Sequence, residues 1–208
     1  MSSGFAGVLA KRLMEPTLLI SVLAAVLSSC ATLQVQPPLK APWFPEQEYI
    51  HKTWNGIDVG VRPLVKEDEY LRLFDDDLPK IGIVALYVEV RNESSSNLAI
   101  DPGSWYLRTG GRRFPALSVK QVFERYYSEH HIRMYSVATD STARLELERS
   151  VLKKGPIEPA GILVGFVFFQ MDPGMAVRWD RGATLIARGL LLDRRSATME
   201  ITLTHANP

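Results

Sequence analysis

The sequence contains a single cysteine, Cys30, among 208 residues. A chain with one cysteine cannot form an internal disulfide, so a hydrophobic core must hold its fold together. An excess of either charge is also missing, because 22 basic and 22 acidic residues remain once residues 1–29 are set aside. A chain balanced in this way has no general electrostatic attraction to nucleic acid. We therefore expect no nucleic-acid partner.

Recognisable catalytic and cofactor motifs are absent as well. The sequence has no G-x-S-x-G, H-E-x-x-H, P-loop or C-x-x-C pattern, each of which sets a reactive group or a ligand at a defined spacing. His130 and His131 are adjacent, and adjacent side chains on a helix diverge, which favours a solvated helix end over a metal site. Residues 75–77 lack the alternating oxygen ligands of a calcium loop, which favours an acidic turn. We expect a non-catalytic protein without a metal or cofactor.

Long apolar runs are scarce, and the clearest uncharged run covers residues 17–29. It follows Lys11 and Arg12. Its length suits the core of a secretory signal, about 7–15 residues, and falls short of the roughly 20 needed to span a bilayer. A short membrane anchor or a buried helix is the alternative. A start at Met14 would remove both basic residues, so we take Met1 as the start.

The segment Leu27-Ser28-Ser29-Cys30 ends this run and resembles the lipobox of bacterial lipoproteins. In that family the cysteine sulfur receives a diacylglyceryl group and the signal is cleaved directly before the cysteine. The resemblance implies that residues 1–29 are a signal peptide and that Cys30 anchors the mature protein in a membrane through its acyl chains. Ala31 stands where an aspartate would retain a lipoprotein at the inner membrane, which implies the outer membrane, facing the periplasm. An ordinary cleavage site beside a chance cysteine is the alternative.

Residues 30–45 hold the cysteine and four prolines. Proline favours an extended backbone of about 3.1 Å per residue, so we predict a tether that reaches roughly 45 Å. Trp43 and Phe44 are expected to mark the point where this tether docks onto the folded domain. An arm that binds a partner is the alternative.

Residues 46–208 show a series of short segments with the alternation and β-branched side chains that are typical of strands. The run 162–169, ILVGFVFF, is continuously apolar and predicts a central strand buried on both faces. Half-buried strands are predicted at 56–64 and 81–92, and shorter ones at 98–100, 104–108, 113–117, 183–192 and 198–204. We predict a mainly β fold, an antiparallel immunoglobulin-like sandwich of about seven strands with helical insertions.

Three segments interrupt the strands with helical patterns: 66–74, 118–134 and 141–152. The inward side chains expected in the first and third are Tyr70, Leu71, Phe74, Leu145 and Leu152. In the second, Ser118 and Gln121 predict a capping box, and the apolar stripe consists of Val119, Val122, Phe123 and Tyr126.

The opposite face of the second helical segment carries Arg125, Tyr127 and His131. Tyrosine and arginine dominate binding hot spots, so we predict that these three residues bind a partner. The alternative is that the segment only covers an open face of the sheet.

Two further stretches resemble exported bacterial immunoglobulin-like domains. One is Val90-Arg91-Asn92-Glu93-Ser94, at the end of a predicted strand, and the other is Pro159-Ala160-Gly161 leading into Gly165-Phe166-Val167-Phe168. The resemblance implies the sandwich fold and no particular function, because that fold hosts many roles. We expect an envelope lipoprotein that acts as an interaction or assembly module for an envelope protein partner. A small-ligand or lipid carrier and a hydrolase with a scattered site are the alternatives.

Overall fold

The computed structural model describes residues 44–129, 137–176 and 182–203, which all belong to one compact unit. The predicted signal peptide, Cys30, Trp43, His130 and His131 lie outside the described residues. Within the described ranges, no helix combines the length and the apolar character needed to cross a membrane.

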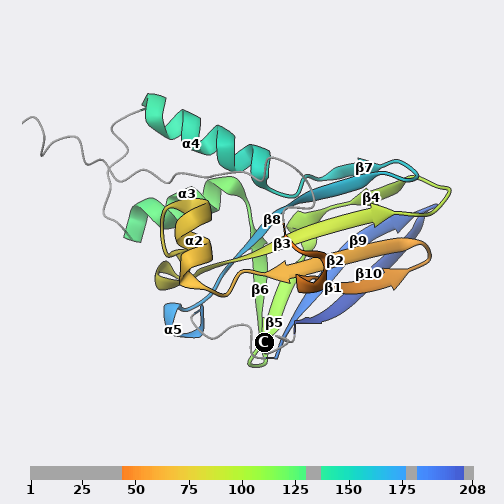
Figure 1. Ribbon diagram of the computed structural model, residues 1–208, viewed down its shortest axis with the longest axis horizontal. Helices are drawn as coiled ribbons and strands as arrows, with labels where there is room; N and C mark the ends of the chain where they lie inside the picture. The colour runs from red at the N-terminus through yellow and green to blue at the C-terminus, as the bar shows by residue number, and fades with distance from the viewer. Residues whose placement is uncertain (1–43, 130–136, 177–181, 204–208) are drawn as a thin grey trace, which may run out of the picture. The chain divides into compact units, whose positions relative to one another are not determined.

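Two layers of antiparallel strands form the body of the domain (Figure 1). The first sheet consists, in spatial order, of β1 (Ile50–Trp54), β2 (Ile57–Pro63), β3 (Ile83–Asn92) and β8 (Ile162–Gln170). The second sheet is built around β9 (Ala183–Leu192), with β10 (Arg195–Leu203) on one side.

On its other side, β9 pairs with two short strands, β4 (Leu98–Ile100) and β5 (Tyr106–Thr109). The outer neighbours of these are β7 (Gly155–Ile157) beside β4 and β6 (Arg112–Leu117) beside β5. The end of β6 also pairs with β8, so this strand joins the two sheets. The prediction of a mainly β, antiparallel sandwich is therefore confirmed, with ten strands in the described ranges instead of about seven.

The two strands that the sequence did not predict are β1 and β7. In β1 most side chains are exposed, so its sequence IHKTW shows no clear apolar face. Its pairing with β2 follows from the turn at Asn55 and Gly56, whose φ angles of 47° and 77° suit a tight two-residue hairpin. A strand of three residues such as β7 is too short to show the alternation of apolar and polar side chains from which strands are predicted.

The hydrophobic side chains form two clusters, one on each face of the first sheet. Alternate residues of β3 point to the space between the sheets, and the others point outward, under the helices. These helices are α2 (Glu67–Phe74), α3 (Val119–Glu129) and α4 (Val137–Ser150). The helices bury the outer face, so β3 is buried on both sides and is not half-buried as its alternation predicts.

The remaining helices are single turns. They are three 3-10 turns, Glu46–Glu48, Leu78–Ile81 and Pro102–Ser104, and α5 (Pro173–Ala176). The acidic residues 75–77 link α2 to the second of these turns, as the interpretation of an acidic turn requires.

Strand β8 is the predicted central strand, and its second half is buried on both faces. Phe166 and Phe168 are each 1% exposed and pack under α2, while Phe169 is fully buried between the sheets. The first residue, Ile162, is 57% exposed, so the prediction holds for the aromatic half of the strand only.

The rotation of two helices differs from the prediction. In α2, Leu73 is buried and Leu71 is 46% exposed, because the hydroxyl of Tyr70 binds the backbone at Leu64 and Ala85 and so fixes the inward face. In α4, Leu147 is fully buried and Leu145 is 47% exposed. The expectation that Leu71 and Leu145 point inward is therefore wrong. Leu152 is buried, although it follows the end of the helix.

The two stretches that resemble immunoglobulin-like domains meet at Asn92. Its backbone N–H donates to Gly161 O at 2.9 Å, and its carbonyl accepts from Ala160 N at 2.7 Å. Its fully buried side chain donates to Ser96 O and Ile157 O, both at 2.8 Å. Asn92 thereby ties β3 to the turn that leads into β8. The family resemblance itself stays a prediction.

Candidate interaction surface

The predicted binding face of α3 is used inside the fold. Tyr127 is only 6% exposed and stacks on Phe123, with ring centres 5.7 Å apart. The guanidinium of Arg125 donates to Ile81 O at 3.1 Å and pairs with Glu129 at 2.7 Å. His131 lies outside the described residues. The expectation that Tyr127 faces outward is wrong, because α3 packs through two sides of its surface and not through one stripe. The predicted capping box is confirmed by Ser118 N donating to Gln121 Oε1 at 2.8 Å and by Gln121 N donating to Ser118 Oγ at 3.3 Å.

The chain enters the described domain on the outer face of the first sheet. Phe44 is 5% exposed and contacts Tyr87 edge-on, with ring centres 5.1 Å apart. The Arg62 guanidinium lies 3.8 Å from the centre of the Phe44 ring and binds the carboxylates of Glu48, at 2.5 Å, and Glu69. These contacts attach residues 44–48 to strands β2 and β3 and to α2.

A second group of charges lies beside this contact, around His51. Its Nδ1 is 2.8 Å from Asp58 Oδ2 and its Nε2 is 3.2 Å from Glu46 Oε1. Arg91 pairs with Glu46 at 3.3 Å and also with Glu89. Three carboxylates share Arg91 and His51 here, so this group stabilises the attachment through mutual contacts and keeps an excess of negative charge.

Three buried polar atoms beneath the same segment have no hydrogen-bond partner within the described residues: Tyr49 Oη, Tyr87 Oη and Arg62 Nη1. Burial, with the charge of Glu89 nearby, raises the pKa of Tyr87 to about 12, and burial also raises the pKa of Tyr49. Both phenols therefore stay protonated at neutral pH and are unsuited to act as bases.

A cleft of about 360 Å³ lies between the start of α3, the second half of β8 and the segment 151–154. Its charged groups are Lys154 and Asp101, which pair with each other at 2.6 Å. Ser118 and Gln121, at its rim, are joined by the capping box. None of the unpartnered buried polar atoms of the described residues lines the cleft.

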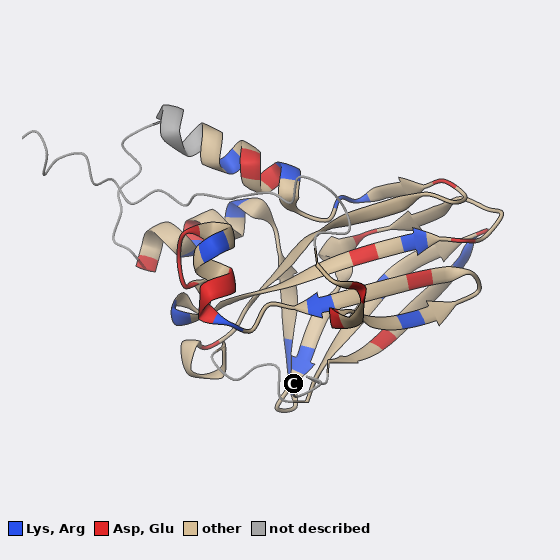
Figure 2. Ribbon diagram, in the orientation of Figure 1, with Lys and Arg blue, Asp and Glu red and all other residues tan. Residues whose placement is uncertain are grey.

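The outer face of the second sheet carries a different arrangement, which we term the Arg–Tyr surface: Tyr106, Arg108, Arg113 and Arg188. The guanidinium carbons of Arg113 and Arg188 lie 5.3 and 4.9 Å from the centre of the Tyr106 ring. Arg188 Nη2 is also 3.4 Å from Tyr106 Oη. Strands β5, β6 and β9 supply these residues. Figure 2 shows how basic and acidic residues are distributed along the ribbon. Two exposed cations are thus held against one aromatic ring.

Arg188 lies on the outer face through the alternation of β9, in which Leu185 and Ala187 point into the core, and a bulge follows it directly. The register with β10 shifts between Ala197 and Thr198, and Gly189, with φ of 69°, is the extra residue. The carbonyl of Arg188 accepts from Trp105 Nε1 at 2.9 Å and from Ser104 Oγ at 3.1 Å. These two hydrogen bonds hold the backbone of Arg188 directly before the extra residue Gly189.

The charges of the Arg–Tyr surface are only partly compensated. Arg108 lies directly opposite Arg113 in the register of β5 and β6, and like charges in that position destabilise a sheet. Glu200 of β10 pairs with Arg108 at 3.0 Å. In the part of the chain that the structure describes, neither Arg113 nor Arg188 has a carboxylate within ion-pair distance.

Comparison with known proteins identifies no family. No family model matches the chain, and no curated protein matches it. Among solved structures, the chain is similar to a candidate lipoprotein of Bacillus subtilis at 14% identity and a TM-score of 0.39, covering 76% of this chain and 39% of that one. It is also similar to a functionally unknown protein from Listeria monocytogenes at 8% identity and a TM-score of 0.39, covering 74% and 80%. The chain spans only about two fifths of the Bacillus structure, and likenesses at this level carry no argument about function.

Proposed function

We propose that this protein is a lipid-anchored, non-catalytic interaction module of the bacterial cell envelope, and that the Arg–Tyr surface binds an envelope protein partner. The observation that carries the proposal is the pair Arg113 and Arg188, exposed and stacked on Tyr106 without a carboxylate partner in the described ranges. Arginine and tyrosine supply much of the energy at protein interfaces. Three strands, β5, β6 and β9, contribute arginine and tyrosine side chains to the same outer face of the second sheet.

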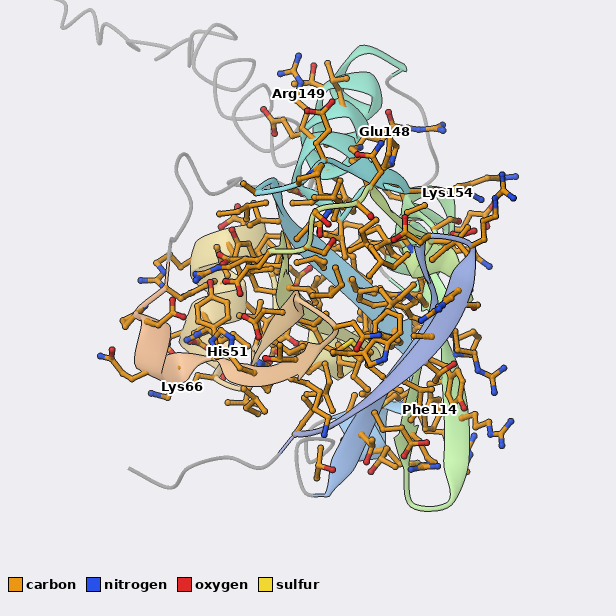
Figure 3. The ribbon with its side chains drawn as sticks, turned by 90° about the vertical axis from the view of Figure 1, so that its right-hand side faces the viewer. His51, Lys66, Phe114, Glu148, Arg149 and Lys154 are labelled. Atoms are coloured by element: carbon orange, nitrogen blue, oxygen red, sulfur yellow. The ribbon has the colours of Figure 1, made fainter. Side chains whose placement is uncertain are left out.

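The point where the chain enters the domain supports the same proposal. Phe44 docks on the outer face of the first sheet, whereas the Arg–Tyr surface lies on the outer face of the second sheet. In Figure 3, His51 of β1 and Phe114 of β6 mark the two sheets on opposite sides. A lipid anchor at Cys30, with a tether of roughly 45 Å, would reach the first face and leave the second face free for a partner.

Site-specific photo-crosslinking in native envelopes tests this function. Pro115 is exposed and lies opposite Tyr106 in the register, so a benzophenone side chain placed there samples the surface without removing an arginine. Arg149, exposed on α4, is the matched control position. We expect one protein adduct from position 115 and not from position 149. Adducts from position 149 alone would place the interface on the helical side.

The cleft favours a second candidate, a small-ligand carrier, because its volume is near the lower limit of ligand pockets, about 300 Å³. Val119 lines the cleft at the start of α3. If the protein is a carrier, native mass spectrometry of the envelope-purified chain will show a bound small molecule, and Val119→Trp will displace it. A wild-type mass that matches the lipidated chain alone would remove this candidate.

A further inference from the structure

We propose that the partner at the Arg–Tyr surface presents acidic side chains, and that their carboxylates pair with Arg113 and Arg188. This inference rests on the proposed function, since it names the chemistry of the partner at the same surface.

The contacts with Tyr106 use only part of each guanidinium. Arg188 directs one edge atom, Nη2, toward Tyr106 Oη at 3.4 Å, and the remaining edges of Arg113 and Arg188 have no carboxylate within ion-pair distance in the described residues. Those edges match a carboxylate in a two-pronged contact. Because the ring and the bulge at Gly189 restrain the side chains, a partner would order them at a lower entropic cost.

The surface already contains one arginine–carboxylate pair, made through a single hydrogen bond. Glu200 reaches Arg108 from the neighbouring strand β10, with Oε2 3.0 Å from Nη2. The same face therefore binds a carboxylate within the chain at one arginine and leaves two arginines without one among the described residues. A protein segment with two or more acidic side chains would supply a carboxylate to each of these two arginines.

The position of the surface argues against the anchoring bilayer as its partner. Anionic lipid headgroups also attract arginine, but the chain enters the domain on the outer face of the other sheet, at Phe44. A tether that follows the shortest path from Phe44 places the first sheet nearest the bilayer and Arg113 and Arg188 on the far side of the domain. We therefore commit to an acidic protein segment and treat lipid as an outcome of the test.

The probe is a fluorescent peptide of alternating glutamate and serine, compared with its glutamine–serine counterpart, and the protein is the full chain in detergent. Arg113→Ala with Arg188→Ala should weaken binding of the glutamate peptide by about tenfold. The control, Lys52→Ala with Arg149→Ala, removes two exposed cations elsewhere and should leave the affinity unchanged. Glu200→Gln should tighten binding severalfold, because it releases Arg108.

Further measurements distinguish an acidic protein partner from a lipid partner and from a loss of folding. Glutamine substitutions at the same two arginines repeat the test if the alanine variant fails to fold, as judged by its melting midpoint. If the arginine variant loses binding to phosphatidylglycerol vesicles and not to the glutamate peptide, the partner is lipid and the inference is wrong. Equal binding of the glutamate and glutamine peptides would also overturn it.

The result that would contradict this inference alone differs from the result that would contradict the proposed function as well. A protein adduct from position 115 that forms equally well without Arg113 and Arg188 would leave the interaction module in place and remove the acidic partner. If position 115 gives no adduct while other positions do, the Arg–Tyr surface is not the interface, and both proposals are wrong.

Discussion

At the scale of single residues, the hydroxyl group of a buried tyrosine stabilises the fold where neighbouring groups form hydrogen bonds with it. Tyr70 and Tyr87 are both fully buried. The Tyr70 hydroxyl donates to Leu64 O at 3.0 Å and accepts from Ala85 N at 2.9 Å. The Tyr87 hydroxyl has no partner among the described residues. The two rings therefore form a natural comparison in which burial is equal and hydrogen bonding differs.

We expect Tyr70→Phe to lower the free energy of unfolding by about 1–3 kcal/mol, because it leaves the backbone N–H of Ala85 unpaired in the core. Tyr87→Phe should change it by less than about 0.5 kcal/mol or raise it, because this substitution breaks no hydrogen bond to any described residue. Urea unfolding of both variants measures the difference. Equal losses would mean that the Tyr87 hydroxyl also has a strong partner, such as an internal water.

A second prediction concerns Gly165 on the inner face of β8. The chain crosses beside it, and Leu152 N donates to Phe166 O at 2.9 Å. A Cβ at position 165 would lie 2.3 Å from Leu152 N, so Gly165→Ala must push the crossing segment away. We expect a loss of about 2–3 kcal/mol.

The matched control is Gly174→Ala in α5, where a Cβ meets nothing within 4 Å. This variant should unfold within about 0.5 kcal/mol of the wild type. Thermal or urea unfolding of both variants decides the point. If the two glycine variants unfold alike, the crossing of residues 151 and 152 over β8 leaves room for a side chain, and the packing argument is wrong.

At the scale of elements, local pattern predicted where many strands and helices lie but not how far they are buried. The alternation in β3 suits a half-buried strand, and only the helices on the other face bury its second side. Those helices come from distant parts of the sequence. The sequence of β3 alone therefore does not indicate that helices cover its outer face. The rotation of α2 depends in the same way on the hydrogen bonds of Tyr70 to two other segments.

The burial of α3 gives a prediction opposite to the one that its sequence suggests. Tyr127 is 6% exposed and packs against Phe123 and Tyr126, with ring centres 5.7 Å away in both pairs. We therefore expect Tyr127→Ala to cost about 3 kcal/mol, the loss typical of a large buried side chain. The control is Lys120→Ala on the exposed side of the same helix, which should cost under about 0.5 kcal/mol. A midpoint that barely moves in Tyr127→Ala would place this ring in solvent.

At the scale of the whole molecule, the Arg–Tyr surface arises from pairing between distant strands. The hairpin sequence Arg108-Thr-Gly-Gly-Arg112-Arg113 is enough to place Arg108 opposite Arg113, and this part was open to prediction. Arg188 joins them only because β5 pairs with β9. That strand order is not encoded in a local pattern, so the sequence alone indicated α3 as the binding element instead.

The last prediction concerns how the domain is attached. Both hydrophobic clusters are built from side chains between Phe44 and Leu203, whereas Cys30 lies outside the described residues. Anchoring and folding should therefore be separable. We expect Cys30→Ala to move the protein out of the detergent phase in a phase-separation assay, because the variant would lack the proposed acyl chains, which contribute about 0.8 kcal/mol per buried CH₂. The melting midpoint of the domain should stay within a few degrees of the wild-type value. If the wild type enters the detergent phase no more than the variant, Cys30 carries no lipid, and a secreted domain replaces the anchored one.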